Sequence, residues 1–271
     1  MMKVELTTLK DCESPEIEKL LETLLERKEE AVASGNGELA NQCWRETEAL
    51  KLNILYINAF SKIKNEKYRD AWCELERCEI NCNFLEENSS QEFLVKTRVC
   101  FIKEKIEVLQ SLYPYCIFAS PGFTVSYYKC SICDHKIRPR SRCEHKKGKI
   151  YNGELCVHIA GDMEFKEISL VTKPVQKYSV VHDDKTLDFS LLIYLFDIVE
   201  NPFEDWDVNW TTMKFPIDRF SSLEKGGECP CKSGAIFKDC CLEKDEVEIP
   251  HVDFTFSKPI PDSKEKIKFP Y

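Results

Sequence analysis

Apolar residues recur at intervals of three and four positions through the first part of the chain. In residues 14–32 they stand at Ile17, Leu20, Leu21, Leu24 and Leu25, which is the stripe of an amphipathic helix. Similar spacing returns in about residues 38–64, 68–82 and 93–109. Because turn-forming residues separate these stretches, the pattern predicts a bundle of four helices, or helical hairpins, within residues 1–112.

The pattern changes after Tyr113-Pro114, where short runs rich in β-branched and aromatic residues alternate with Gly, Asp and Pro. Such runs predict strands, here at residues 123–128, 150–151, 155–159, 168–172 and 175–181. Residues 187–200 have helical spacing instead and are expected to form one helix. The last residues, 249–271, alternate at Val252, Phe254 and Phe256, which predicts one strand followed by a mobile end.

Composition then limits the class of protein. The chain has 271 residues, of which 43% are hydrophobic and 31% charged, with a formal net charge of −9. That is enough apolar material for one large domain or two to three small ones. No apolar run approaches the roughly 18–20 residues of a membrane span, and residues 1–10 lack the basic and apolar regions of a secretory signal. We therefore expect no membrane segment and a cytoplasmic location.

Fifteen cysteines need an explanation other than disulfide bonds in a long cytoplasmic chain. Some lie singly along helical stretches, as Cys73, Cys78 and Cys100 do, and these are expected to fill the core. Others gather in two tight clusters. Clusters of this kind are typical of metal sites.

The first cluster has the spacing Cys130-x2-Cys133-x9-Cys143-x-His145. A Cys-x2-Cys pair lets both thiolates reach one ion at about 2.3 Å, and a second pair a short loop away completes a tetrahedron. Soft thiolates with one imidazole favour zinc, and four protein ligands leave no position for water, so the expected role is structural. The fourth ligand stays open, because His135, Cys156 and His158 compete with His145.

The loop around this cluster is strongly basic. Residues 129–149 contain eight basic and two acidic side chains, a net charge of +6, so the remainder of the chain carries −15. With Tyr127, Tyr128 and Tyr151 nearby, such a loop could dock on a phosphate backbone. The more common interpretation of such a charge run is a solvated loop that balances the acidic helices. The candidate nucleic-acid contacts are Lys136, Arg138, Arg140, Arg142, Lys146 and Lys147.

The order of Cys-x2-Cys, Cys-x-His, Gly148, Tyr151, Gly153 and Cys156, followed by Glu-Ile-Ser-Leu-Val-Thr-Lys-Pro from residue 167, looks like a small zinc module of phage-type structural proteins. The resemblance covers about residues 128–175. It implies only the zinc ligands already proposed.

The second cluster has the spacing Cys229-x-Cys231-x8-Cys240-Cys241. The four thiols can close a compact tetrahedral site in a segment of about twenty residues with almost no core of its own, so that metal binding supplies its folding free energy. The rival interpretation is a redox role for the adjacent cysteines. Zinc binding opposes it, because thiols that coordinate zinc are unreactive.

This second cluster resembles the SEC-C motif, the zinc-binding tail of the SecA translocation ATPase and of many otherwise unrelated bacterial proteins. The match covers about residues 226–243, where Cys229, Pro230, Cys231, Ser233, Gly234, Phe237, Lys238, Cys240 and Cys241 fall on the usual positions. Lys232 stands where the family generally has Gly, and Ala235-Ile236 replaces a basic pair. The resemblance implies a bacterial protein with a zinc-dependent docking module for a protein partner or the ribosome.

A catalytic motif is harder to find. The sequence contains no nucleophile elbow, phosphate-binding glycine loop, dinucleotide fingerprint or His-Glu-x-x-His helix. The clearest acidic-histidine cluster is His182-Asp183-Asp184, which could be a general base or metal site and is more simply a polar turn. An enzyme would need a deep pocket that joins these residues to other polar groups.

Together these observations predict an α+β protein in four parts: a helical bundle in residues 1–112, a β-rich zinc-knuckle domain with one helix in 113–220, a SEC-C zinc module in 221–245 and a tail in 246–271. The expected function is non-enzymatic: an adaptor or interaction protein with two structural zinc ions and a protein partner. The first alternative is a nucleic-acid-binding regulator that uses the basic loop, residues 136–149. The second is an enzyme with a site near His182. The sequence does not indicate an oligomeric state.

Overall fold

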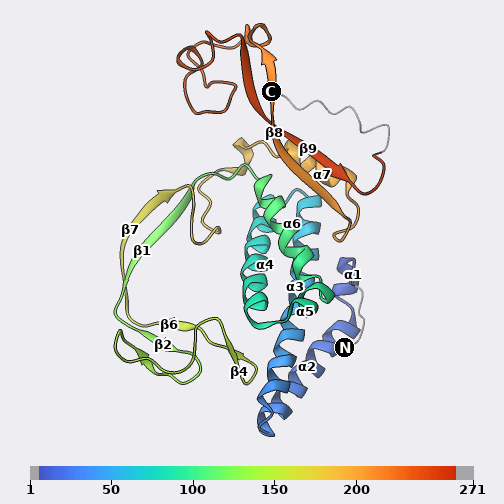
Figure 1. Cartoon of the computed structure of the whole chain (residues 1–271), viewed down its shortest axis with the longest axis vertical. Coiled ribbons are helices and arrows are strands. Elements are labelled where there is room, and N and C mark those ends of the chain that lie inside the picture. Colours follow the sequence, from blue (N-terminus) through green and yellow to red (C-terminus); the bar gives the residue numbers. More distant parts are fainter. Residues whose placement is uncertain (1–5, 261–271) are drawn as a thin grey trace. The chain divides into compact units, whose positions relative to one another are not determined.

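The computed structural model describes residues 6–260 of the chain (Figure 1). It contains helices in its first part and mainly strands in the rest, so the predicted α+β class is confirmed. The chain divides into two compact units, Met1–Pro202 and Phe203–Tyr271. The boundaries predicted after residues 112 and 220 lie inside these units, and each unit is described by itself below.

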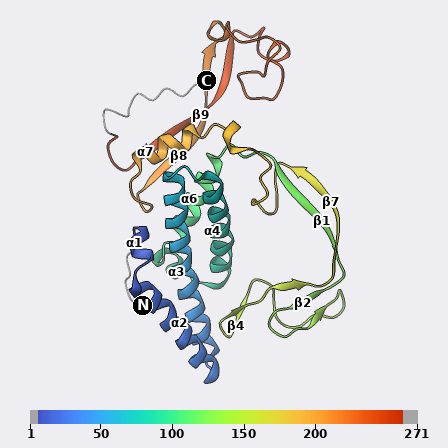
Figure 2. The ribbon, with the colours of Figure 1, turned by 180° about the vertical axis from the view of Figure 1, so that it is seen from behind.

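Most of the helices belong to the N-terminal half of the first unit. Helices α3, α4 and α6 lie side by side, as both views show (Figures 1 and 2). No helix among residues 6–260 is long and apolar enough to cross a membrane. The helices are α1 (Leu9–Cys12), α2 (Pro15–Ala33), α3 (Gly37–Lys64), α4 (Tyr68–Asn88), α5 (Gln91–Lys96), α6 (Val99–Ser111) and α7 (Ser190–Ile198).

The last predicted helix of the bundle is in fact two helices. Arg98 adopts a left-handed backbone, with φ of 65°, and this ends α5 and begins α6. The buried Asn53 holds the break, because its side-chain amide donates to the carbonyl of Thr97 at 3.0 Å. The apolar spacing continues across the break, so the pattern alone could not reveal it.

The helical core is built from side chains of α3, α4 and α6. Its fully buried side chains include Leu52, Tyr56, Leu75, Ile102 and Ile106. Of the dispersed cysteines, Cys78 is buried in this core, whereas Cys73 and Cys100 are half-buried. All of the chain's cysteines are free thiols in the structure.

The strands of the first unit form three small antiparallel sheets: β1–β7, β3–β2–β6 and β4–β5. Pro121 and Gly122, expected to precede the first strand, lie within it. Proline is tolerated there because β1 belongs to a two-stranded sheet, where one edge is open. The strands are β1 (Phe118–Val125), β2 (Tyr128–Cys130), β3 (Lys136–Ile137), β4 (Ile150–Tyr151), β5 (Glu154–Leu155), β6 (His158–Ala160) and β7 (Met163–Val171).

The strand predicted at residues 175–181 is wrong. Only a single bridge, between Phe118 and Val180, forms there, and helix side chains take up two of the carbonyls that a longer strand would need. The indole N–H of Trp72 donates to the carbonyl of Lys177 at 2.6 Å, and the guanidinium of Arg69 donates to the carbonyl of Val180 at 3.0 Å. The short 3-10 helix η1 (Asp184–Thr186) follows.

The second unit consists of one long ribbon and a loop module. Strand β8 (Trp206–Pro216) pairs antiparallel with β9 (Glu246–Phe256) along their whole length. The loop between them carries the 3-10 helices η2 (Ile217–Phe220) and η3 (Phe237–Asp239). The predicted tail strand is therefore present and starts earlier, at Glu246. Most of the mobile end predicted after it lies outside the described residues.

Candidate metal centres

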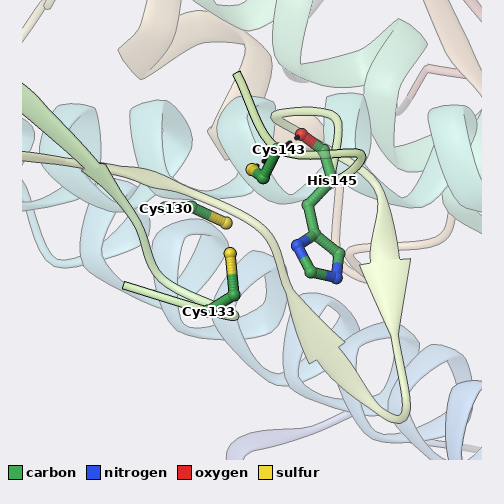
Figure 3. Close-up of side chains that lie close together, drawn as sticks. All are labelled: Cys130, Cys133, Cys143 and His145. Atoms are coloured by element: carbon green, nitrogen blue, oxygen red, sulfur yellow. Dashed lines mark hydrogen bonds between the residues drawn. The ribbon is translucent and has the colours of Figure 1, made fainter. Parts of the chain in front are cut away.

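The structure brings the four predicted residues of the first cluster together. One ligand atom each from Cys130, Cys133, Cys143 and His145 lies within 4.8 Å of every other (Figure 3). Cys130 is buried, Cys143 and His145 are half-buried and Cys133 is exposed. Among the described residues, Nδ1 of His145 is buried without a hydrogen-bond partner. A buried ring nitrogen that has no hydrogen-bond partner and lies beside three thiols is expected of a histidine that can ligate a metal ion.

Local backbone contacts set up this geometry. Cys130 ends β2, and a tight turn with Asp134 in the left-handed region, φ 55°, brings Cys133 back beside it. The amide of Cys130 donates to the carbonyl of His135 at 3.0 Å, and the amide of Asp134 donates to the carbonyl of Cys130 at 2.9 Å. The turn thus fixes two thiols on one side, as expected for a zinc knuckle.

The β4–β5 hairpin anchors the cluster to the helices. Its turn residues, Asn152 and Gly153, both have positive φ, as a two-residue type I′ turn requires. The amide of Gly153 donates to Oδ1 of Asn41 at 2.8 Å on α3. The side chain of Asn88 on α4 donates to the carbonyl of Gly148 and accepts from the amide of Ile150. The segment that carries the first cluster is therefore docked on α3 and α4 by hydrogen bonds to the side-chain amides of Asn41 and Asn88.

The other candidates for the fourth ligand are now distinguishable. His135 has its Nε2 atom 3.1 Å from the hydroxyl of Ser141, and His158 lies on β6, paired through the backbone with Cys130. Cys156 is buried and its sulfur is 3.7 Å from that of Cys130, although it is not part of the four-residue group. Cys156 is thus the nearest rival to His145.

We predict that His145→Ala weakens zinc affinity at the first cluster about 100-fold or more, because it removes one of four ligands. Cys156→Ser is expected to weaken it by about tenfold, the lower end of the effect of a neighbour that only supports a ligand. Competition with a chromophoric chelator would measure both, with the exposed Cys116→Ser as the control. The reverse ranking would assign Cys156 as the fourth ligand.

The thiols of the first cluster differ in acidity. Burial raises the pKa of Cys130, but hydrogen bonds from the amides of Ile132 and Cys133, and from neighbouring thiols, outweigh it and lower the pKa to about 6. Burial and the Cys130 thiolate raise the pKa of Cys156 to about 11. One thiolate therefore forms readily while its neighbour resists ionisation, and a divalent cation would relieve that repulsion.

The four sulfurs of the second cluster lie close together. The sulfur of Cys231 lies 3.3 Å from that of Cys229 and 3.6 Å from that of Cys240, and the sulfurs of Cys240 and Cys241 are 3.7 Å apart. Four thiolates placed tetrahedrally at about 2.3 Å from a zinc ion would be about 3.8 Å apart. The observed distances are close to this and much longer than a disulfide bond. The hydroxyl of Ser233, which lies 3.2 Å from the sulfur of Cys231, is the main cause of lowering the Cys231 pKa to about 6.

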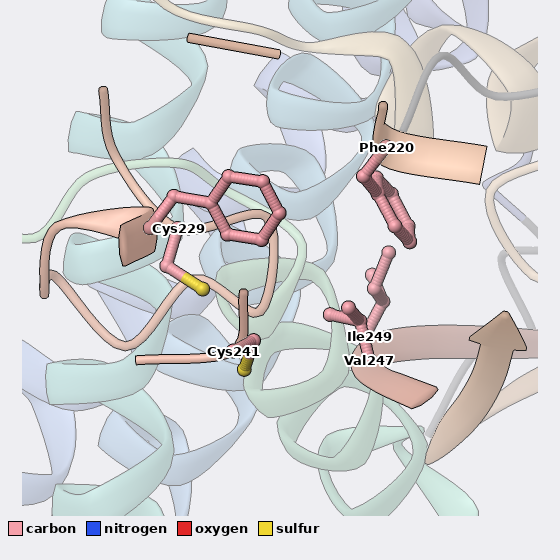
Figure 4. Close-up of a cluster of buried hydrophobic side chains, with 6 residues drawn as sticks. Phe220, Cys229, Cys241, Val247 and Ile249 are labelled. Carbon is pink, nitrogen blue, oxygen red and sulfur yellow. The ribbon is translucent and has the colours of Figure 1, made fainter. Parts of the chain in front are cut away.

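The module has more core than the sequence suggested. Cys229 and Cys241 lie in one buried cluster with aromatic and aliphatic side chains of the module and of β9 (Figure 4). Val247 and Ile249 come from β9, so the β8–β9 ribbon supplies apolar side chains that the loop itself does not have. The other members of the cluster are Phe220 and Phe237.

Lys232 adopts a left-handed backbone, with φ of 60°. A side chain in this region of backbone conformation costs about 1–2 kcal/mol, a cost that glycine avoids. We therefore predict that Lys232→Gly raises the free energy of unfolding of the second unit by about 1 kcal/mol. Denaturant unfolding of the zinc-loaded protein would measure it. Lys225→Gly removes the same side chain where φ is not positive and should slightly destabilise, so equal effects of the two variants would contradict the prediction.

The basic loop is exposed. Arg138, Arg140, Arg142, Lys146 and Lys147 are all solvent-exposed, and no ion pair of these side chains appears among the described residues. Lys136 differs, because its ammonium lies 3.7 Å from the centroid of the Tyr127 ring. An ion pair between the loop and an acidic helix forms at the end of the loop, where the ammonium of Lys149 lies 3.9 Å from the carboxylate of Glu87 on α4.

The residues around His182 form a polar turn. Asp183 accepts from the amide of Lys185 and caps η1, while Asp184 pairs with Arg69 at 2.8 Å. Nε2 of His182 lies 3.3 Å from the Cys116 sulfur, but it also accepts the backbone amides of Cys116 and Ile117. The two backbone amides therefore occupy the ring nitrogen that lies nearest the thiol. An open pocket of about 370 Å³, lined by residues such as Trp44, Arg77 and Tyr178, does not include these groups.

The chain was also compared with known proteins. No protein-family model, no curated protein and no solved structure matches it. The residues of the two clusters are of types that bind metal ions, and they lie close enough together to do so.

Proposed function

We propose that this protein is a non-enzymatic, zinc-binding adaptor in which two structural zinc ions hold loops rigid for contact with a protein partner. One observation carries the proposal: each cluster offers four protein ligands within 4.8 Å. A zinc ion with four protein ligands has no open position for water or substrate, so it stabilises structure rather than catalyses.

The SEC-C resemblance supports the second cluster as the docking module. All four of its cysteines are present. Lys232, Ile236 and Lys238, which lie between them in the sequence, are exposed and available for contact with a partner. Ile236 is an exposed apolar side chain flanked by cations, a combination suited to an apolar and acidic partner surface. The proposal is therefore a bacterial protein whose C-terminal module docks a partner.

Elemental analysis of the purified full chain tests the zinc part, with two zinc ions per chain expected. Affinity capture followed by mass spectrometry tests docking: the double variant Ile236→Asp, Lys238→Glu should lose a partner that the unchanged chain captures while it keeps both zinc ions. Lys19→Glu, on an exposed position of α2, is the control. A partner captured equally by all three proteins, or a chain without zinc, would overturn the proposal.

A second candidate function rests on the basic loop. Five cations on one zinc-anchored loop, exposed and without ion pairs in the described part of the chain, form the kind of surface that contacts phosphates. The net charge of −9 opposes non-specific binding, so the contact would be confined to this loop.

For this candidate we predict that Arg138→Ala, Arg140→Ala and Arg142→Ala together weaken binding to short RNA or DNA at least tenfold and reduce its salt dependence by about three phosphate contacts. Fluorescence anisotropy at two salt concentrations would measure both. The matched control replaces Lys10, Lys19 and Lys96, exposed on the helices, and removes the same charge elsewhere. Equal loss in the two triple variants, or no binding by the unchanged chain at low salt, rejects a nucleic-acid function.

A further inference from the structure

The β1–β7 ribbon has one face made entirely of apolar residues. Alternate residues of a strand share a face, and so do residues directly opposite each other in an antiparallel pair. On β1 the alternating positions are Ala119, Pro121, Phe123 and Val125. Their partners on β7 are Leu170, Ile168, Phe165 and Met163, in that order. We call these eight residues the apolar face of the ribbon.

A bulge keeps this face continuous. The register shifts between Gly122 and Phe123, where Gly122 pairs with Glu167 but Phe123 pairs with Phe165. The extra residue, Lys166, is thereby placed with Glu167 on the opposite face. Without the bulge, the apolar residues on either side of it would point in opposite directions. The rings of Phe123 and Phe165, with centroids 5.8 Å apart, confirm that they share a face.

The opposite face differs in character and in what it contacts. It carries Ser120, Thr124, Glu164 and Ser169, and at its base Phe118, which is buried and stacks with Trp72 of α4 at 6.1 Å between centroids. The polar face is thus turned toward the helices at the base of the ribbon. Beyond the base both faces are open to solvent, because every residue of β7 from Met163 to Leu170 is exposed.

The exposure of the apolar face is large. Met163, Phe165, Ile168 and Leu170 are 59%, 53%, 64% and 68% exposed. With Phe123, and with side-chain areas of roughly 150–250 Å² for large residues, the face offers about 600 Å² of apolar surface. A patch of this size is at the upper end of what single-chain proteins expose, and such patches are often functional. A two-stranded ribbon is also only marginally stable in water by itself.

We propose that the apolar face packs against the same face of a second copy of this chain, so that two ribbons form a small two-layer sandwich. The face contains no charged or hydrogen-bonding side chain that would select a different partner. A two-fold pairing covers it with a surface of equal size and equal chemistry. Two copies would bury about 1,200 Å², which reaches the lower end of stable interfaces, and the charged residues of the opposite face stay in water.

Sedimentation velocity of the zinc-loaded full chain, from about 1 to 100 µM, tests the proposal. The unchanged chain should have twice the mass of one chain at the upper concentrations. The double variant Ile168→Lys, Leu170→Lys should be monomeric throughout, since each dimer would bury four new charges. Ser169→Lys, which lies between them on the opposite face, should remain dimeric.

Both replaced side chains are mostly exposed, so the double variant should keep the circular dichroism and zinc content of the unchanged protein. If it does not, Met163→Lys at the far end of the same face provides an independent variant, which should raise the dissociation constant at least tenfold. A monomeric unchanged chain at 100 µM, a dimer that survives both sets of changes, or a Ser169→Lys variant that is equally monomeric would overturn the proposal. None of these outcomes depends on the zinc-dependent docking function.

Discussion

Replacement of Cys231 with serine is expected to remove one of the two zinc ions and to unfold the module between β8 and β9. Cys231 is half-buried and packs against the edge of the buried cluster of Phe220, Phe237, Val247 and Ile249. Serine differs from cysteine by one atom, so the change affects packing little. It does remove a thiolate from a four-ligand site. Structural zinc contributes about 10–16 kcal/mol in small modules, which is comparable to a whole domain's usual stability, and the small apolar cluster of this module cannot replace that.

Zinc content and limited proteolysis would show this effect. The variant should carry one zinc ion instead of two, and cleavage should appear between residues 221 and 245 while the helices stay protected. The control is Cys100→Ser, a half-buried cysteine of α6 outside both clusters, which should keep two zinc ions. A Cys231→Ser protein that resists cleavage in the module would show that the ribbon supports it without metal.

The helices and the metal ligands are the parts that could be predicted from the sequence. An amphipathic stripe indicates which face of a helix is buried, and in α2 Ile17 and Leu24 of the stripe are buried, whereas Leu25 is 51% exposed. The Cys-x2-Cys and Cys-x-Cys spacings are local, so the two thiols of each pair lie close together without help from tertiary contacts. Cys156 shows the limit, because only the β4–β5 hairpin brings its sulfur to that of Cys130.

The strands were harder to predict for two physical reasons. Strand β8 is not among the predicted strands, although Trp206, Val208 and Trp210 alternate with polar residues, which is a strand pattern. In residues 175–181 the composition favours a strand, but backbone groups there bond to side chains of Arg69 and Trp72. No local pattern reports hydrogen bonds between residues about one hundred positions apart.

These bonds from α4 are also why residues on both sides of the boundary predicted after residue 112 belong to one unit. Trp72 is buried, its ring lies within 4.9 to 6.1 Å of the rings of Tyr113, Tyr115 and Phe118, and its N–H bonds to Lys177. One side chain therefore ties a helix to the linker, to β1 and to the segment after β7.

Trp72→Ala is accordingly expected to lower the free energy of unfolding of the first unit by about 4 kcal/mol, the usual cost of deleting a buried large aromatic side chain. For a unit of this size the midpoint of thermal unfolding should fall by roughly 10 °C. Trp72→Phe keeps much of the ring but leaves the Lys177 carbonyl without its donor, and should cost about 1–3 kcal/mol.

Calorimetry would measure these shifts, and hydrogen exchange would show whether the amides of residues 177–181 lose protection along with α4. The half-buried Trp44, which lines the open pocket, is the matched control, and Trp44→Ala should shift the midpoint far less. If Trp72→Ala instead exposed residues 177–181 and left the helices at their original midpoint, the strands and the helices would unfold independently. Residues 1–112 would then form a domain of their own, as the change of sequence pattern at Tyr113 first indicated.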